Sequence, residues 1–127
     1  MGSRGSFLES GGFRAPAGWH TVDYADGIKV LEPINSKASR SLPERSNTPG
    51  TAYVLYRRDG TFDQLRVFGK DRKPVFDIDY GKHQGTYSLH VHYFKNGERE
   101  KNGAVKILHK GDYLFEKYRR LFKEVPL

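Results

Sequence analysis

Alternating apolar and polar residues, interrupted by tight-turn signals, constrain this chain more than any other feature of its sequence. Asp59-Gly60 lies between TAYVLYRR and TFDQLRVF, and Asn96-Gly97 follows YSLHVHYF. Asp-Gly and Asn-Gly pairs favour the two-residue turns that join neighbouring antiparallel strands. The residues from Thr51 onward are therefore predicted to form a β-meander, in which each strand pairs with the next one along the chain.

Further strands are predicted upstream of this meander, and a helix is predicted after it. Residues 19–24 and 28–31 flank an Asp-Gly pair, and residues 104–108 form a short last strand. The segment DYLFEKYRRLFKEV then follows a helical period, with Asp112 as the N-cap. Its apolar stripe consists of Leu114, Tyr118, Leu121, Phe122 and Val125. The sequence thus predicts an α+β fold, in which an antiparallel sheet of about five strands is packed by a C-terminal helix.

Length and local composition predict one domain with an N-terminal arm. A chain of 127 residues has the size of a single domain. Residues 1–18 are rich in glycine and serine, and we expect a flexible arm there. Residues 19–127 are expected to form a single α+β domain. Within it, residues 33–50 have the proline and serine content of a long loop, and loops of this length are usually functional or mobile.

The charge of the chain indicates its partners. A net charge of +7 predicts attraction to a polyanion, and we expect nucleic acid, with RNA favoured, or an acidic host protein. The absence of cysteine excludes disulfides, thiolate metal sites and cysteine nucleophiles. No apolar run approaches the ~20 residues that span a bilayer, and no secretory signal is visible. We therefore expect no membrane partner and a cytoplasmic location.

The stretch DIDYGKHQGTYSLHVHYF gathers many titratable side chains. It contains His83, His90 and His92, and it begins with Asp77 and Asp79. Because side chains alternate along a strand, the last two histidines are predicted to share one face, and the aspartates to share a face of the preceding strand. If the strands pair, carboxylates and imidazoles lie within a cross-strand distance of about 5 Å. The first histidine lies in GKHQG, which is predicted to interrupt the chain between the two strands.

Three interpretations of this cluster remain open at the level of sequence. His-x-His with carboxylates can bind zinc or form a 2-His-1-carboxylate centre, although no third ligand with a recognisable spacing is present. Two imidazoles can also act as base and acid, since histidine titrates near neutral pH. The third interpretation is a hydrated sheet face without chemistry. We expect both His90 and His92 to be exposed, so that their replacement by alanine has little effect on stability.

Acid–base chemistry at this cluster suits RNA cleavage, which needs no metal or other cofactor. One group takes the proton of the ribose 2′-hydroxyl, another donates a proton to the leaving 5′ oxygen, and a cation stabilises the transition state. The candidate cations are Arg57, Arg58, Arg66, Lys82 and Lys106. Tyr87, together with Tyr80 and Tyr93, offers an aromatic platform for a base.

Part of the chain also resembles a known superfamily. The segment R-V-F-G-K-D-R-K-P-V-F-D-I-D-Y-G, followed by a loop histidine and then H-V-H-Y, resembles the toxin and prophage nuclease domains of the barnase–EndoU–colicin–RelE superfamily. The opening M-G-S-R-G-S is similar to the N-termini of prophage-encoded proteins. The resemblance implies a small α+β fold and metal-independent RNA cleavage, in a host-cell cytoplasm if the protein is phage-encoded. It points to His83, His90 and His92, with Asp77 and Asp79 as orienting carboxylates.

A second hypothesis is a non-catalytic binding protein from a phage or mobile element. Such a protein would bind nucleic acid or inhibit a host protein. Geometry distinguishes the hypotheses, because catalysis requires the side chains to converge on one cleft. Binding requires only a continuous basic or aromatic surface, and a metal site requires three or more converging ligands.

Overall fold

The computed structural model describes residues 7–8, 18–34, 41–83, 85–100 and 105–126, and of Phe7, Leu8 and His83 it describes the backbone only. Its strands are β1 (Phe7–Leu8), β2 (Gly18–Ala25), β3 (Ile28–Pro33), β4 (Ala52–Tyr56), β5 (Phe62–Phe68), β6 (Pro74–His83), β7 (Thr86–Lys95), β8 (Glu98–Arg99) and β9 (Val105–Ile107). Helix α1 (Tyr113–Tyr118) and the 3₁₀ turn η1 (Arg119–Leu121) follow them.

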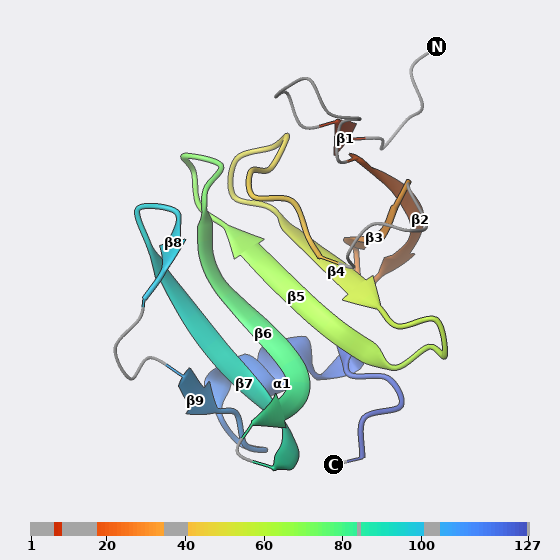
Figure 1. The fold of residues 1–127 in the computed structure, drawn as a ribbon, viewed down its shortest axis with the longest axis vertical. Coiled ribbons are helices and arrows are strands. Elements are labelled where there is room, and N and C mark those ends of the chain that lie inside the picture. Colours follow the sequence, from red (N-terminus) through yellow and green to blue (C-terminus); the bar gives the residue numbers. More distant parts are fainter. Residues whose placement is uncertain (1–6, 9–17, 35–40, 84, 101–104, 127) are drawn as a thin grey trace.

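One sheet dominates the fold (Figure 1). Strands β1 to β8 are neighbours in sequence order, and β9 pairs with β7. The pair β3–β4 is parallel, and the other pairs are antiparallel. Because parallel neighbours cannot be joined by a tight turn, the chain needs the long connection that was predicted at residues 33–50. Residues 35–40 of this connection lie outside the described part of the chain.

The α+β class and the predicted meander, now β4 to β7, are confirmed. The prediction of about five strands was too low, because the sheet has nine strands within the described residues. The strands predicted at 19–24, 28–31 and 104–108 all join the sheet of the meander, and β1 and β8, with two residues each, give no periodic signal. Strand β1 also falls within the predicted flexible arm, and Gly18 already belongs to β2. Residues 1–6 and 9–17 of that arm lie outside the described residues.

Two predicted hairpin turns have the backbone geometry that their sequences require. Asp26 and Gly27 have φ angles of 52° and 80°, and Asn96 and Gly97 have φ angles of 53° and 82°. Positive φ at both central residues defines the type I′ turn, which asparagine, aspartate and glycine tolerate best. These turns fix the pairing of β2 with β3 and of β7 with β8.

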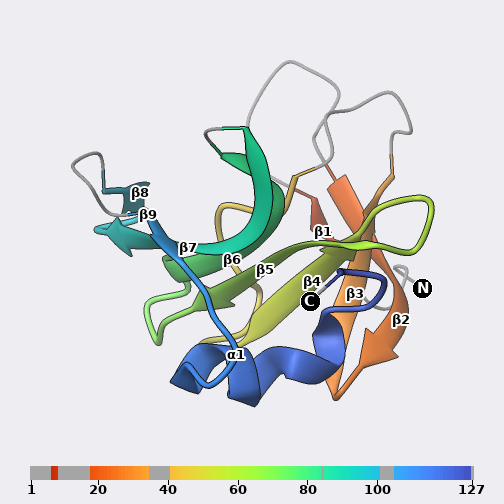
Figure 2. The same ribbon diagram turned by 90° about the horizontal axis from the view of Figure 1, so that it is seen from below.

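The predicted interruption at residues 81–85 is too long, because the two strands are interrupted only between His83 and Thr86. Strand β6 continues through Gly81 to His83, and its ladder with β7 runs without a register shift from Phe76↔Tyr93 to His83↔Thr86. The glycine pairs with Ser88 within that ladder. The two longest strands of the sheet therefore form one continuous hairpin, whose closed end rises away from α1 in Figure 2.

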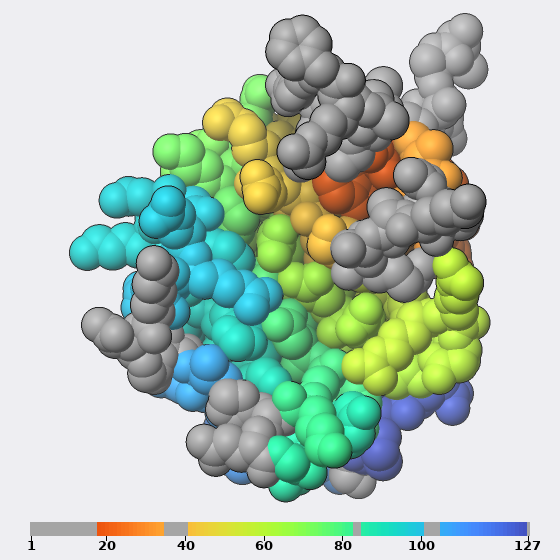
Figure 3. Space-filling model, in the orientation of Figure 1, coloured from red at the N-terminus to blue at the C-terminus, as the bar shows by residue number. Residues whose placement is uncertain are grey.

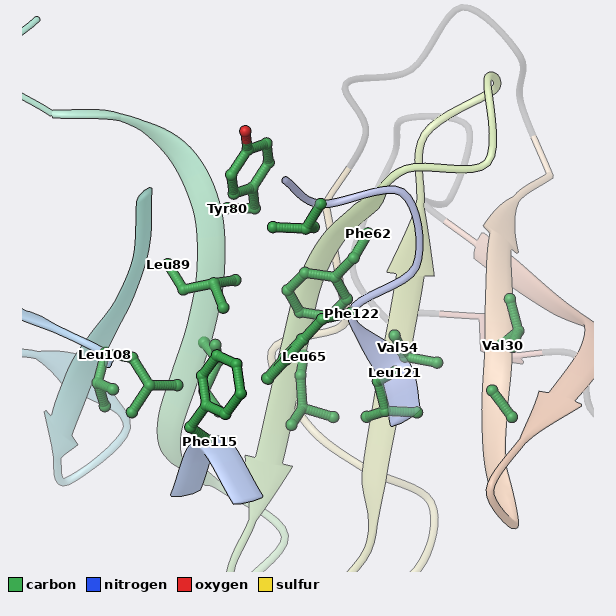
Figure 4. Close-up of a cluster of buried hydrophobic side chains, with 14 residues drawn as sticks. Val30, Val54, Phe62, Leu65, Tyr80, Leu89, Leu108, Phe115, Leu121 and Phe122 are labelled. Carbon is green, nitrogen blue, oxygen red and sulfur yellow. The ribbon is translucent and has the colours of Figure 1, made fainter. Parts of the chain in front are cut away.

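Helix α1 covers one face of the sheet (Figure 2) and closes the larger hydrophobic core. Aromatic rings join the helix to the strands, as Figure 4 shows. The ring centroid of Phe122 lies 5.0 Å from that of Phe62 on β5 and 5.4 Å from that of Phe115. Tilted and edge-to-face pairs of this kind stabilise a core beyond the area that they bury.

The C-terminal helix is shorter than predicted. It ends at Tyr118, whose φ of −111° and ψ of 11° leave the helical region, and the chain tightens into η1. Two hydrogen bonds to the sheet hold this end of the chain. Tyr56 Oη donates to the Leu121 carbonyl at 2.8 Å, and the Phe62 N–H donates to the Lys123 carbonyl at 3.0 Å.

The predicted N-cap and apolar stripe are only partly right. Asp112 lies at the N-cap position, but its carboxylate accepts from the His109 N–H at 2.8 Å and caps no helical N–H. The stripe omitted Phe115, which is 1% exposed, and it included Leu114, which is only partly buried. Leu121, Phe122 and Val125 are buried as predicted, although the helical period ends before them at η1.

The other face of the sheet divides into an apolar and a polar half. A second hydrophobic cluster consists of Trp19, Leu31, Leu42, Tyr53, Leu55 and Phe68. Leu42 comes from the long connection, and the Trp19 indole N–H fixes the same segment by donating to the Ser41 carbonyl at 2.7 Å. Beside this cluster, the same face of β5 to β8 carries the charged side chains of Arg66, Asp77, Asp79 and Arg99.

We expect Phe115→Ala to lower the free energy of unfolding by about 3–5 kcal/mol, because it leaves a cavity among packed rings. Tyr113→Ala is the control, since that ring is 75% exposed, and we expect a loss below about 1 kcal/mol. Urea denaturation of both variants measures the difference. Equal losses would show that Phe115 does not anchor the helix.

Candidate acid–base site

The register of β6 and β7 brings the predicted aspartates and histidines together. Asp77 lies opposite His92, and Asp79 lies opposite His90. All four alternate with core residues, so they lie on the face that α1 does not cover. Figure 3 shows this face, with β6 to β8 in green to cyan and the helix behind them. The predicted cross-strand proximity is confirmed.

Asp77 is the buried centre of this face, with a side-chain exposure of 0%. Arg66 binds it through two nitrogens, with Nε 2.8 Å from Oδ1 and Nη2 2.9 Å from Oδ2. Gln64 Nε2 and Arg99 Nη2 each donate to Oδ2 at 2.8 Å. Charge-assisted and bidentate bonds are short and directional, so this carboxylate fixes the positions of its three donor side chains.

Arg66 extends this network to the long connection. Its Nη1 donates to the carbonyls of Leu42 and Pro43 at 3.0 and 3.1 Å. Its guanidinium carbon lies 5.3 Å from the ring centroid of Phe94. Arg66 is only 8% exposed, and each of its guanidinium nitrogens donates to a carboxylate or a carbonyl. This burial does not favour the phosphate contact that was predicted for it.

Asp79 is the carboxylate with unusual proton affinity. Its Oδ2 lies 3.3 Å from both Arg99 Nη2 and His92 Nε2, and its Oδ1 is buried without a hydrogen-bond partner among the described residues. Burial, followed by the negative charge of Asp77, raises the pKa of Asp79 to about 7, although Arg99 and Arg66 act in the opposite direction. Near neutral pH this group is therefore present both with and without its proton, as proton transfer requires.

The two histidines differ in their access to solvent. The His92 side chain is 19% exposed, whereas His90 is 5% exposed. Their ring centroids lie 5.7 Å apart, and His90 Nδ1 lies 3.2 Å from Ser88 Oγ. The expectation that both imidazoles are exposed is wrong for His90. Strand β9 is the reason, since it places Ile107 directly opposite His90.

Arg99 belongs to the site but was not predicted from the sequence. It lies in the two-residue strand β8, opposite Phe94 of β7, and its guanidinium carbon is 5.8 Å from the centroid of that ring. Its side chain is 42% exposed and bridges Asp77 and Asp79. The signal that could have revealed it is the Asn96-Gly97 turn, which sends the next residues back along the same face.

The remaining predicted nucleic-acid contacts do not gather on this face. They are Arg57, Arg58, Lys82, Tyr87 and Lys106. The ring of Tyr87 lies 5.7 Å from that of the core residue Tyr80, on the helix side. Lys106 Nζ lies 6.0 Å from the ring of Tyr93 on the same side. Arg57 Nη2 donates to the Tyr80 carbonyl at 2.6 Å, and Arg58 and Lys82 are exposed.

His83 and the metal interpretation are constrained less directly. The backbone of His83 ends β6 opposite Thr86, but its side chain lies outside the described residues, so its catalytic role stays a prediction. Within the described ranges, no three histidine, aspartate or glutamate side chains are arranged to hold a metal ion.

The same part of the chain contains no helix of the length and apolarity needed to cross a membrane.

We expect Asp77→Asn to lower the free energy of unfolding by about 3–5 kcal/mol, because it leaves the buried Arg66 guanidinium without its counter-charge. Asp63→Asn is the matched control, since Asp63 pairs with Arg57 at 3.5 Å near the surface. That change should cost less than about 1 kcal/mol. Chemical denaturation at pH 7 compares the two, and similar losses would contradict the role of Asp77 as the buried centre.

The raised pKa of Asp79 predicts a pH-dependent stability. Since the folded state binds this proton more tightly than the unfolded state, whose pKa is near 3.8, stability falls as the pH rises from about 4 to about 7. The Asp79→Asn variant should not lose stability over this pH range. One pKa unit corresponds to about 1.36 kcal/mol, so the free energy of unfolding of the variant should exceed that of the native chain by at most about 4 kcal/mol at pH 8. Parallel stability profiles from pH 4 to pH 8 would contradict the raised pKa.

Comparison of the chain with protein-family models, with curated proteins and with solved structures finds no match. The resemblance of residues 51–94 to the barnase–EndoU–colicin–RelE superfamily therefore stays a prediction. The geometry described above is independent of that resemblance. Asp79, His92 and Arg99 converge on one partly exposed face, and the buried Asp77 holds Arg99 through its Oδ2.

Proposed function

We propose that this chain cleaves RNA by acid–base catalysis at Asp79, His92 and Arg99. The observation that supports this most is the shared contact of Asp79 Oδ2, which lies 3.3 Å from the His92 imidazole and 3.3 Å from the Arg99 guanidinium. One proton acceptor, one proton donor and one cation thus lie together on a basic protein. These are the groups that cleavage of the RNA backbone uses.

In the proposed reaction the His92 imidazole removes the proton of a ribose 2′-hydroxyl. The 2′ oxygen forms a bond to the adjacent phosphorus, and the bond between phosphorus and the 5′ oxygen breaks. Protonated Asp79 delivers its proton to that leaving oxygen, so the products are a 2′,3′-cyclic phosphate and a 5′-hydroxyl. The direct contact then lets the proton return from His92 to Asp79, which restores the starting state.

The cation in this proposal is Arg99 rather than Arg66. The Arg99 side chain is 42% exposed, whereas Arg66 is buried between Asp77 and the loop carbonyls. A guanidinium beside the reacting phosphate stabilises the negative charge that builds up in the transition state. His90 serves as a positioning residue, since its buried ring packs against His92 at 5.7 Å.

The experiment uses a labelled single-stranded RNA with the full chain, with and without EDTA. We expect His92→Ala to lower the rate about 10²- to 10⁴-fold, the usual contribution of a general base. The matched control is His109→Ala, since His109 is exposed outside this face, and it should retain the native rate. Arg99→Ala should lose a similar factor, and Arg99→Lys should recover part of it.

Equal cleavage by the His92 and His109 variants would remove His92 from the mechanism. If the native chain binds RNA without cleaving it, the non-catalytic alternative is correct instead. RNA affinity measured at several salt concentrations tests whether the chain binds RNA at all. Phosphate contacts make the affinity fall steeply with ionic strength.

A further inference from the structure

Strand β9 forms an open edge of the sheet. It pairs with β7 on one side, and no other described strand lies beyond it (Figure 1). The Leu108 N–H donates to the Leu89 carbonyl at 2.8 Å, and directly bonded residues alternate along an antiparallel pair. Lys106 is therefore the next residue bonded to β7. The backbone N–H and C=O groups of Val105 and Ile107 point away from β7, toward the open edge.

The side chains of this edge do not protect it. Val105 is 36% exposed and Ile107 is 51% exposed, and both are β-branched and apolar. Edge strands are commonly blunted by charges, proline or bulges, because their free backbone groups attract another strand. Only Lys106 provides a charge within β9, and its ammonium group turns to the Tyr93 ring on the helix side.

Two apolar grooves adjoin the edge, and both are lined by Ile107 and Leu108. One has a volume of about 580 Å³ and contains Tyr87, which is 56% exposed. The other has a volume of about 520 Å³ and contains Tyr113, which is 75% exposed. Exposed apolar side chains scattered singly need no explanation, but contiguous ones beside a groove indicate a contact surface.

The charge around these grooves is positive. Lys110 lines the first groove and Lys106 the second. Lys117 Nζ lies 5.8 Å from the exposed Tyr113 ring at the rim. Asp112 is the only acidic residue among the lining residues of either groove, and its carboxylate already accepts the His109 N–H. An occupant with apolar and acidic side chains therefore complements this surface.

We propose that β9 is a docking edge for an extended acidic segment of a partner protein, which joins the sheet as a further strand. Its backbone pairs with the outward groups of Val105 and Ile107, as in other cases of strand addition. Its apolar side chains enter the two grooves, and its carboxylates meet Lys106 and Lys110. This proposal goes beyond RNA cleavage, because the two grooves lie on the helix side of the sheet, opposite the face that carries Asp79, His92 and Arg99.

A library of random twelve-residue peptides displayed on phage tests this proposal with the full chain as the target. Binders are counter-selected on Ile107→Pro, which removes an outward N–H but leaves the ladder with β7 intact. We expect the recovered peptides to be net acidic, with apolar and acidic residues at every second position, because the grooves, Lys106 and Lys110 all lie on the helix side of the new strand. The peptides should bind the Lys106→Glu/Lys110→Glu variant at least tenfold more weakly than the native chain. The control variant Lys70→Glu/Lys95→Glu should bind them with the native affinity. The double charge variants keep the test valid if the proline variant does not fold.

The position of the bound peptide is measured by amide hydrogen exchange. We expect slower exchange at the Val105 and Ile107 amides, while the Lys106 amide, already bonded to β7, changes less. Recovery of basic or unpatterned peptides, or protection elsewhere on the chain, would overturn the proposal. Two further results would overturn it. The native chain could sediment as a dimer that the Ile107→Pro substitution dissociates, or an RNA oligonucleotide could slow exchange at the same amides.

Discussion

The buried ion pair between Arg66 and Asp77 is the interaction on which the polar face depends. Taking both charges out of water is costly, and the cost is recovered only if every donor and acceptor is satisfied. Here the remaining Arg66 nitrogen reaches the Leu42 and Pro43 carbonyls, and the second Asp77 oxygen accepts from Gln64 and Arg99. The pair thereby joins β5, β6, β8 and the long connection into one network.

This network also determines the chemistry of the site. Asp77 is fixed two residues from Asp79 on the same face, so its charge opposes ionisation of its neighbour. Arg99 lowers that penalty only in part, because it is shared between the two carboxylates. The result is a pair of aspartates with different tasks. Asp77 holds the structure together, and Asp79 keeps a proton available near neutral pH, next to an imidazole that can exchange it.

Much of the fold follows from local signals in the sequence, whereas the site follows only in part. The turns at Asp26-Gly27 and Asn96-Gly97, and the pairing of the aspartates with the histidines, depend on neighbouring residues and were predicted correctly. Asp77 is bound by Arg66, which in turn is held by a loop without periodicity, and Arg99 lies in a strand too short to be recognised. The burial of His90 depends on Ile107, seventeen residues away along the chain. Such long-range contacts leave no mark in a local pattern.

The uninterrupted ladder between β6 and β7 has a consequence for how this protein can vary. Side chains alternate with a period of two, so a slip of one residue between these strands would exchange their faces along its length. The apolar side chains of Phe76 and Ile78 would turn to solvent, and the aspartates would turn into the core beneath the helix. Substitutions along this hairpin therefore disturb one position at a time, but a single inserted or deleted residue removes both the core and the polar face at once. The hairpin tolerates changes of side chain far more readily than changes of length.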